Sequence, residues 1–457
     1  MALNPARELA REVVTRVRER NAFAHETMNL ALARRKLPSS DAALATRIAY
    51  GTIACRGTLD EIVVRQLKRP GSTDPKVLDA LACTTWEMLF GGLAAYAAVS
   101  QGVDLVRKLR PTQAGLANAT LRRIVADLRR FPYGDPATDA AAQARQYGHP
   151  KWLAQLFRHE WGVQTTDAIM AANNAAAPLY VAHLPFRQSF SAVMEKLESS
   201  GAQPSAGPVE GSILIGKPSA AVAATMLSER DIIVMDGAAQ LAVALADVQP
   251  KQHIVELGAG RGAKSLLLAG WARRRGGIAR VTGVDIHAFK SEVMRADAHK
   301  LSADEVTALT LDATRAGLDE ALAAADNTPI DTVFIDAPCT GLGTLRRHPD
   351  KRWRLKPRDI NDCARLGSAL LQQASAVLRP GGSLVYSTCT LTAAENAAVV
   401  RDFLGTRRGH QFRIDAIVRD ALPRECLEFL GEDGTLQTLP RTGGMDGHYV
   451  ARMVSTV

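Results

Sequence analysis

A regular alternation of strand-like and helix-like segments begins near residue 236 and restricts the fold of this 457-residue chain more than any other feature. Short apolar runs that read as buried strands are separated by stretches with helical periodicity. Repeated strand–helix units predict a parallel, doubly wound sheet of the Rossmann-like α/β class. The expected strands are residues 254–257, 281–285, 306–311, 332–336 and 383–387, with a last one at 447–453.

The N-terminal third has a different pattern and a different charge. Residues 4–132 show helical periodicity throughout, with Pro and Gly at the joins and no strand-like alternation, which predicts a bundle of about six helices. Residues 1–134 contain 21 Lys and Arg against 12 Asp and Glu, and this excess accounts for the whole formal net charge of +9. A basic module attached to a neutral one favours a polyanionic partner.

The remaining boundaries follow from breaks in these patterns. Residues 1–134 are expected to form the helical domain, and 135–160 a linker with a connecting helix. Residues 161–235 contain two strand-like runs, 179–182 and 212–215, and a helical run at 189–199 with Ser189 as its N-cap, which predicts a small α/β subdomain. Residues 236–457 are expected to form the large α/β domain. Four arginines near the end of the bundle suit either a solvated helix face or phosphate contacts: Arg122, Arg123, Arg129 and Arg130.

The chain has no signal-peptide pattern and no apolar run long enough for a membrane span, so we expect a cytoplasmic protein without a membrane partner. Its six cysteines form no C-x-x-C pair, which argues against a zinc ribbon and predicts reduced thiols and no metal site.

A glycine-rich turn follows the first strand of the large domain, and it reads Gly258-Ala259-Gly260-Arg261-Gly262-Ala263-Lys264. Such a turn can be a simple strand–helix connection, or it can let a ligand approach the backbone closely. Acids end the next strands: Asp285 is placed for ribose hydroxyls, Asp312 for an adenine amino group, and Asp336 closes the fourth strand. Only Arg261 and Lys264 could serve a pyrophosphate, which favours S-adenosylmethionine over NAD.

Two cysteines lie just past predicted strands. One is in Asp336-Ala337-Pro338-Cys339-Thr340-Gly341 and the other in Ser387-Thr388-Cys389-Thr390. A free cysteine is often only a small buried apolar residue. However, ligands bind at the carboxyl ends of parallel strands, so two thiols placed there indicate chemistry.

These two motifs resemble those of the RNA 5-methylcytosine methyltransferases. The resemblance extends to the segment from Thr344 to Asp350, to Glu395-Asn396 and to Asp446-Gly447-His448-Tyr449. Within that group the chain is most similar to the RsmB (Sun/Fmu) family of bacterial rRNA methyltransferases, whose members carry an N-terminal NusB-like RNA-binding domain. The resemblance covers nearly the whole chain.

The resemblance implies an enzyme that uses S-adenosylmethionine to methylate C5 of a cytosine in RNA, with rRNA as the expected partner. Cys389 corresponds to the nucleophile that adds to cytosine C6, and Cys339 to the cysteine that assists product release. Asp336 corresponds to the acid that polarises the base beside the cofactor. We expect the protein to act as a monomer.

Other functions stay open at this point. The family's usual D-x-C-A-A-P-G-G-K-T loop is replaced here by Glu-Leu followed by the turn at 258–265, which admits a non-catalytic RNA-binding or ribosome-assembly factor that kept the fold. The same chemistry could also act on tRNA or another RNA. A DNA cytosine methyltransferase is disfavoured, because there the nucleophile belongs to the Pro-Cys motif.

Overall fold

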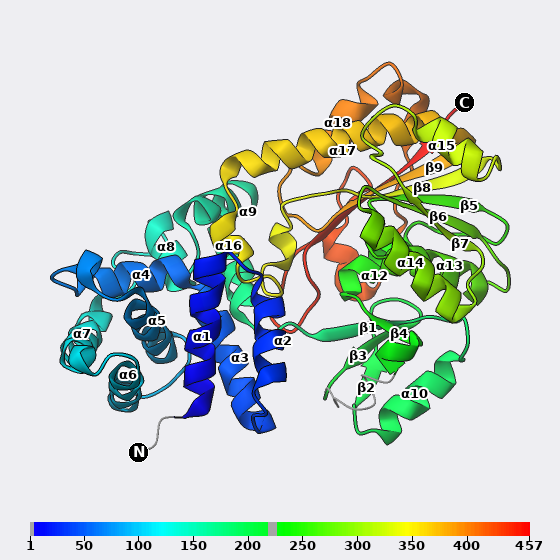
Figure 1. The fold of residues 1–457 in the computed structure, drawn as a ribbon. Helices are drawn as coiled ribbons and strands as arrows, with labels where there is room; N and C mark the ends of the chain where they lie inside the picture. Colours follow the sequence, from blue (N-terminus) through cyan, green and yellow to red (C-terminus); the bar gives the residue numbers. More distant parts are fainter. Residues whose placement is uncertain (1–3, 218–225) are drawn as a thin grey trace. The chain divides into compact units, whose positions relative to one another are not determined.

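The computed structural model describes residues 4–217 and 226–457, and the chain divides into two compact units. The first unit consists of residues 1–175 together with 345–355, and the second of residues 176–344 together with 356–457 (Figure 1). The helical N-terminal region and the α/β region predicted from the sequence therefore belong to separate packing units.

The first unit is entirely helical. Asn4 caps the first helix by accepting a hydrogen bond from the Ala6 amide at 2.7 Å, and Asp74 caps another through the Lys76 amide at 2.8 Å. A positive φ of 75° at Gly162 kinks the last helix. The helices are α1 (Pro5–Arg20), α2 (Ala24–Arg34), α3 (Ser39–Ala54), α4 (Arg56–Arg65), α5 (Pro75–Leu89), α6 (Ala95–Leu109), α7 (Ala114–Asp127), α8 (Ala140–Gln146) and α9 (Lys151–Asn174).

A buried carboxylate joins three of these helices. Asp79 of α5 is fully buried and accepts hydrogen bonds from Thr15 at 2.8 Å, from Arg18 at 3.0 Å and from Arg56 at 2.7 Å. Because burying an unpaired charge is costly, the two guanidinium groups are needed to neutralise this site. Part of the basic excess of residues 1–134 therefore serves packing rather than an external partner.

Residues 345–355 belong to the helical unit although the chain on both sides belongs to the other unit. This segment contains α16 (Lys351–Arg354). Arg352 is fully buried and donates to the Asn174 side chain at 2.8 Å and to the Asn173 carbonyl, while the Trp353 indole donates to the Ala54 carbonyl at 2.8 Å. Gly57 of α4 faces the Trp353 ring, where an added Cβ would lie 2.2 Å from a ring atom.

The second unit begins with a small four-stranded antiparallel sheet of order β2-β3-β1-β4, accompanied by α10 (Phe190–Ser199). Ser189 caps α10 by accepting from the Ala192 amide at 3.2 Å, as its position before the helix predicts. The strands are β1 (Leu179–His183), β2 (Pro204–Ala206), β3 (Ser212–Ile215) and β4 (Ile232–Val234). The pattern predicted β1 and β3 but not β2 and β4, because three residues are too few for a periodic signal.

The large sheet has the order β10-β12-β9-β8-β5-β6-β7, and β11 pairs with β12. Strands β9, β8, β5, β6 and β7 run parallel, whereas β10, β11 and β12 are antiparallel additions at one side. All six strands predicted in this region are present. The strands are β5 (His253–Leu257), β6 (Arg280–Asp285), β7 (Val306–Thr310), β8 (Ile330–Asp336), β9 (Leu378–Thr388), β10 (Phe412–Ile414), β11 (Leu436–Thr438) and β12 (His448–Ser455).

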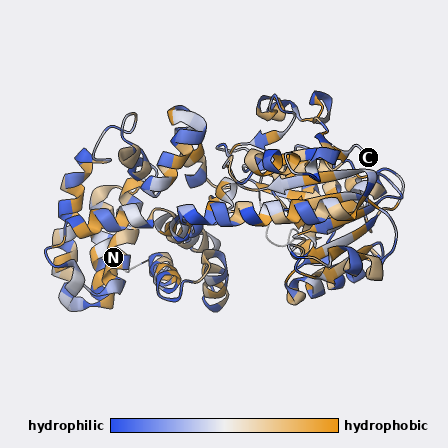
Figure 2. Cartoon of the chain, turned by 90° about the horizontal axis from the view of Figure 1, so that it is seen from above, coloured by the Kyte–Doolittle hydropathy of each residue, from blue (hydrophilic) through white to orange (hydrophobic). Residues whose placement is uncertain are grey.

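Two apolar cores cover the two faces of this sheet. Neighbouring residues such as Val333 and Phe334 belong to different cores, as the alternation of side chains along a strand requires. Figure 1 shows α13 and α14 on one face and α15 and α17 on the other. Figure 2 shows that hydrophilic and hydrophobic residues alternate along the helices of the chain. The helices are α12 (Gly237–Ala244), α13 (Ala263–Arg274), α14 (Ala288–Leu301), α15 (Leu318–Ala325), α17 (Pro357–Val377) and α18 (Ala397–Leu404).

This arrangement is the predicted α/β class, with the helical domain and the small sheet as separate parts. In residues 4–217 and 226–457, no helix combines the length and the apolar character needed to cross a membrane.

Candidate active site

The glycine turn after β5 is shaped by three residues with positive φ: Gly258 at 82°, Gly260 at 59° and Gly262 at 84°. A Cβ at Gly258 would lie 2.4 Å from the Asp336 carbonyl oxygen, so only glycine fits between the two strand ends. Gly262 then stands at the N-terminus of α13. We call residues 258–262 the glycine cradle; its expected role in ligand binding stays a prediction.

Asp285 is the last residue of β6, and its carboxylate is tied to this cradle. One oxygen accepts from the Gly260 amide at 3.0 Å and from Lys290 at 3.2 Å, and the other accepts from the His287 amide at 2.9 Å. The structure thus brings Asp285 together with the glycine turn, as the sequence predicted. Its expected contact with ribose hydroxyls stays a prediction.

Asp312 lies differently from the expectation. Strand β7 ends at Thr310, so this acid stands two residues beyond the strand rather than at its end. Its carboxylate accepts from the Thr314 hydroxyl at 2.6 Å and amide at 3.1 Å and pairs with Arg315 at 3.0 Å. The Thr314 hydrogen bonds, followed by Arg315, hold the Asp312 pKa below its ordinary value. The short loop is therefore held by its own neighbours. Arg261 of the glycine turn is exposed.

A lysine–aspartate pair lies beside the cradle. The Lys264 ammonium of α13 donates to the Asp336 carboxylate, at the end of β8, at 2.6 Å. Burial acts to lower the Lys264 pKa, but the Asp336 carboxylate outweighs it, and Glu256 and Cys389 add to the effect, so the Lys264 pKa lies above its ordinary value. Lys264 is therefore a cation, held between the glycine turn and the cysteine motifs.

The two motif cysteines meet at the neighbouring strand ends. Strands β8 and β9 are parallel neighbours in which Asp336 is paired with Ser387, and the chains then lead to Cys339 and Cys389. The two Sγ atoms are 3.5 Å apart. The hydrogen bond with Cys389, followed by burial, raises the Cys339 pKa well above its ordinary value. A proton shared across this contact stabilises one thiolate and disfavours a second one at the other sulfur.

A buried carboxylate links the two cysteine loops. Glu395 is 1% exposed; it accepts from the Thr340 amide and hydroxyl, both at 2.7 Å, from the Thr392 hydroxyl at 2.7 Å and from the Thr390 hydroxyl at 3.1 Å. Thr340 follows Cys339 and Thr390 follows Cys389, so one side chain holds both loops. We call Glu395 with these three threonines the Glu395 latch. Burial raises the Glu395 pKa, and the four hydrogen bonds oppose that effect.

Two further buried groups support the β9 loop. Asn396 accepts from the Thr388 hydroxyl at 2.6 Å and donates to the Thr390 carbonyl at 3.2 Å. His448 of β12 shares a hydrogen bond of 2.8 Å with Ser387, and burial together with the Lys264 cation lowers the His448 pKa to about 3. The imidazole is therefore neutral near pH 7 and braces the strand end.

Sequence reasoning missed Glu256, which lies two residues before the glycine turn. It is 1% exposed, its Oε2 accepts from the Ser265 hydroxyl, and its Oε1 has no hydrogen-bond partner among the described residues. Burial raises the Glu256 pKa to about 7. The only sequence signal was an acid inside an otherwise apolar strand, directly before a glycine turn. An orphaned buried acceptor beside a bare-backbone cradle fits a ligand with an amino group and a sugar, such as S-adenosylmethionine.

Three protein families match this chain. The 16S rRNA methyltransferase RsmB/F family matches residues 242–454, the NusB family matches 4–126, and the RsmF/B-like ferredoxin-like domain matches 149–222. Ribosomal RNA small subunit methyltransferase B of Thermus thermophilus is 31% identical, covering 99% of this chain and 98% of that protein. The enzyme of the same name from Erwinia tasmaniensis is 29% identical, covering 93% of each.

The fold also has a full-length match. The crystal structure of PH0851 covers 98% of both chains with a TM-score of 0.77 at 21% identity. These matches confirm the predicted family with its NusB domain, and they identify the predicted small α/β subdomain as ferredoxin-like. The chain belongs to the RsmB/F family of S-adenosylmethionine-dependent RNA methyltransferases.

Proposed function

We propose that this protein methylates C5 of a cytosine in 16S rRNA, with Cys389 as the nucleophile, Cys339 as the base that allows release and Asp336 as the group that polarises the pyrimidine. The contact that carries the proposal is the 3.5 Å separation of the two sulfurs at adjacent strand ends. The names of the relatives from Thermus thermophilus and Erwinia tasmaniensis support small-subunit rRNA as the substrate.

The cofactor would be held at the carboxyl ends of β5, β6 and β7. The glycine turn 258–264 would lie against it, Asp285 and Asp312 would bind the nucleoside part, and Glu256 offers its free oxygen to an amino group. When bound, S-adenosylmethionine supplies the methyl group that C5 takes up.

Cys389 starts the reaction as a thiolate. Two neighbours favour its charged form: Lys264 interacts with it electrostatically, and the Cys339 thiol lies within hydrogen-bonding distance. Its sulfur forms a bond to C6, the electron pair of the C5–C6 double bond moves into the ring, and C5 becomes nucleophilic. Covalent addition of this kind divides one difficult step into easier ones.

Asp336 and Lys264 supply the proton that this addition needs. The ring can accept the electron pair at lower cost if N3 gains a proton at the same time. The Lys264 ammonium donates to the Asp336 carboxylate at 2.6 Å, so a proton can pass through Asp336 to N3 and return when the ring is restored.

Cys339 acts later, and the contact between the thiols explains the order. Its pKa is raised mainly by the hydrogen bond with Cys389. Once the Cys389 sulfur is bonded to C6, it is no longer a thiolate, so the largest cause of the raised Cys339 pKa is gone. Cys339 can then give its proton to solvent and, as a thiolate, take the C5 proton; the C5–C6 double bond re-forms and Cys389 leaves as a thiolate.

Two cysteine variants test these roles. We expect Cys389→Ala to abolish methylation, and Cys339→Ala to stop after addition and accumulate an RNA adduct that survives denaturing electrophoresis. The assignment is wrong if Cys339→Ala is inactive without an adduct while Cys389→Ala still methylates RNA.

The RNA target is tested separately. Bisulfite sequencing of RNA from a strain that lacks this gene should show one 16S rRNA cytosine that is no longer protected. Loss of protection in a tRNA instead would keep the chemistry and refute the substrate. Calorimetry with S-adenosylmethionine tests the alternative of a non-catalytic assembly factor, for which no binding is expected.

A further inference from the structure

A groove in the helical unit gathers arginines that the packing of the unit does not use. It has a volume of about 350 Å³ and runs between α1 and α2. Its lining consists of Arg16, Arg20, Ala22, Glu26, Thr27, Leu30 and Arg34. Arg16 and Arg20 are one turn apart on α1, and Leu30 and Arg34 are one turn apart on α2, so each helix presents one side of the groove.

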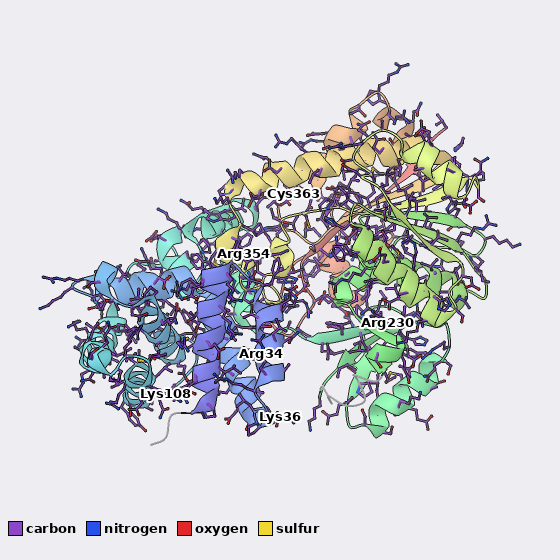
Figure 3. All side chains as sticks on the ribbon, viewed as in Figure 1. Arg34, Lys36, Lys108, Arg230, Arg354 and Cys363 are labelled. Atoms are coloured by element: carbon purple, nitrogen blue, oxygen red, sulfur yellow. The ribbon has the colours of Figure 1, made fainter. Side chains whose placement is uncertain are left out.

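The ion pairs of the helical unit leave two of these arginines free. Arg16 pairs with Glu12 at 2.6 Å, whereas Arg20 and Arg34 have no acidic partner in the part of the chain that the structure describes. Both side chains are exposed. Figure 3 labels Arg34 on α2 and Lys36 just beyond its end; Lys36 is also exposed and without an ion pair among the described residues.

Several other arginines of the unit have partners within it. Arg18 and Arg56 neutralise the buried Asp79. At the end of the bundle, Arg123 donates to the Gln66 carbonyl at 2.8 Å, and Arg122 donates to the Asn118 side chain at 3.2 Å. Arg129 donates to the Ala126 carbonyl at 3.3 Å, and Arg130 lies 3.7 Å from Asp127, so each of the four arginines that the sequence singled out there has a local partner.

We infer that the α1/α2 groove binds the phosphate backbone of the RNA substrate, with Arg20 and Arg34 as its phosphate ligands. The planar guanidinium group matches a phosphate with two parallel hydrogen bonds, and a site with three arginines against the single Glu26 favours a polyanion. Leu30, which is 58% exposed between them, adds an apolar contact for a sugar or base. The inference rests on the proposed function for the identity of the partner as RNA.

One more residue joins this surface to the segment 345–355. Arg354 donates to the carbonyl of Ala22, a groove residue, and its guanidinium lies 4.9 Å from the centre of the Phe23 ring. Arg354 is also paired with Asp350 at 3.3 Å, so its own charge is committed. It therefore fixes the shape of the loop between α1 and α2 and leaves phosphate binding to Arg20 and Arg34.

The test is a double variant, R20Q/R34Q, in the full-length protein. Binding of a 16S rRNA fragment is measured at several KCl concentrations in the absence of cofactor. Each phosphate contact contributes about 0.7–0.9 to the slope of log affinity against log salt. We expect the double variant to lower that slope by about 1.4–1.8 and to bind RNA more weakly at low salt.

The matched control is R122Q/R129Q, which removes the same charge from exposed positions on the same unit. We expect its salt slope to stay close to wild type. If both variants change the salt slope equally, RNA binding depends on the net charge of the helical unit and not on a defined site, and the inference is refuted. If R20Q/R34Q leaves RNA binding unchanged, the groove serves another partner, such as an acidic protein. No methyl transfer is needed, so failure of the cysteine roles would leave this outcome unaffected.

Discussion

The Glu395 latch makes the sharpest prediction, because one buried side chain sets the positions of both cysteine loops. Replacing Glu395 with Gln keeps the shape and removes the charge. The amide oxygen can still accept from the Thr340 amide, but the amide nitrogen must then face the three threonine hydroxyls that now donate to a carboxylate. Those hydroxyls have to rotate and accept instead.

The size of the effect follows from those three contacts. A hydrogen bond to a charged group contributes about 1.5–3 kcal/mol and one between neutral groups about 0.5–1.5 kcal/mol, so the substitution loses roughly 1 kcal/mol at each contact. Removing a buried charge returns part of this loss, as the raised pKa of Glu395 indicates. We expect Glu395→Gln to destabilise the protein by about 1–3 kcal/mol and to lower kcat by about 100-fold, because displacements near 1 Å can cost that much.

Two assays separate positioning from stability. Methyl transfer is measured at a temperature where urea titration shows the variant to be folded, and the rate of disulfide formation between Cys339 and Cys389 under diamide reports their separation. The rate should fall in Glu395→Gln and stay unchanged in Glu195→Gln, an exposed position on α10. A Glu395→Gln variant with the wild-type kcat and the wild-type disulfide rate would refute the role of the latch.

Three other substitutions give predictions from local geometry. Because the Glu256 pKa is raised to about 7 from 4.5, the folded state loses stability as pH rises from about 5 to 7; Glu256→Gln should remove this loss, up to about 3 kcal/mol, in urea titrations at each pH. Gly258→Ala should weaken cofactor binding in calorimetry far more than Gly260→Ala, because only the first Cβ meets a backbone atom, at 2.4 Å. Gly57→Ala should lower stability by about 1–3 kcal/mol, since its Cβ would lie 2.2 Å from the Trp353 ring.

Both glycine substitutions have a control in the same chain. Gly71→Ala places its Cβ in open space in the same helical unit and should leave stability nearly unchanged. Equal losses at Gly57 and Gly71 would show that the Trp353 contact is not responsible. Equal affinities in the Gly258 and Gly260 variants would contradict the role of the Gly258 contact with Asp336. An unchanged pH dependence in Glu256→Gln would contradict the raised pKa of Glu256.

Several features could be predicted because their signals are local. The βα alternation in residues 236–457 came from hydrophobic periodicity, which depends only on neighbours a few residues apart. The glycine turn, the acids and the cysteines could be placed at strand ends for the same reason. The errors were also local: β2 and β4 are too short to show a period, and Asp312 stands two residues beyond its strand.

The sequence alone identified the candidate catalytic and binding residues. They are two cysteines, the acids after the strands, the glycine turn and a basic N-terminal region. Their arrangement required the tertiary structure, because strand order is not written in any local pattern. That order brings Lys264 to Asp336 and Glu395 to Thr340 across the chain.

Tertiary contacts also decided which charges remain available. The net charge predicted a polyanion-binding region, but only packing shows that Arg18 and Arg56 are consumed by the buried Asp79, whereas Arg20 and Arg34 are not. Moving a guanidinium group away from a buried carboxylate leaves that carboxylate unpaired, which costs a large free energy. Such an arginine is therefore not available to an external partner. The composition gives the number of charged residues, whereas the tertiary structure determines which of them are free to bind an external polyanion.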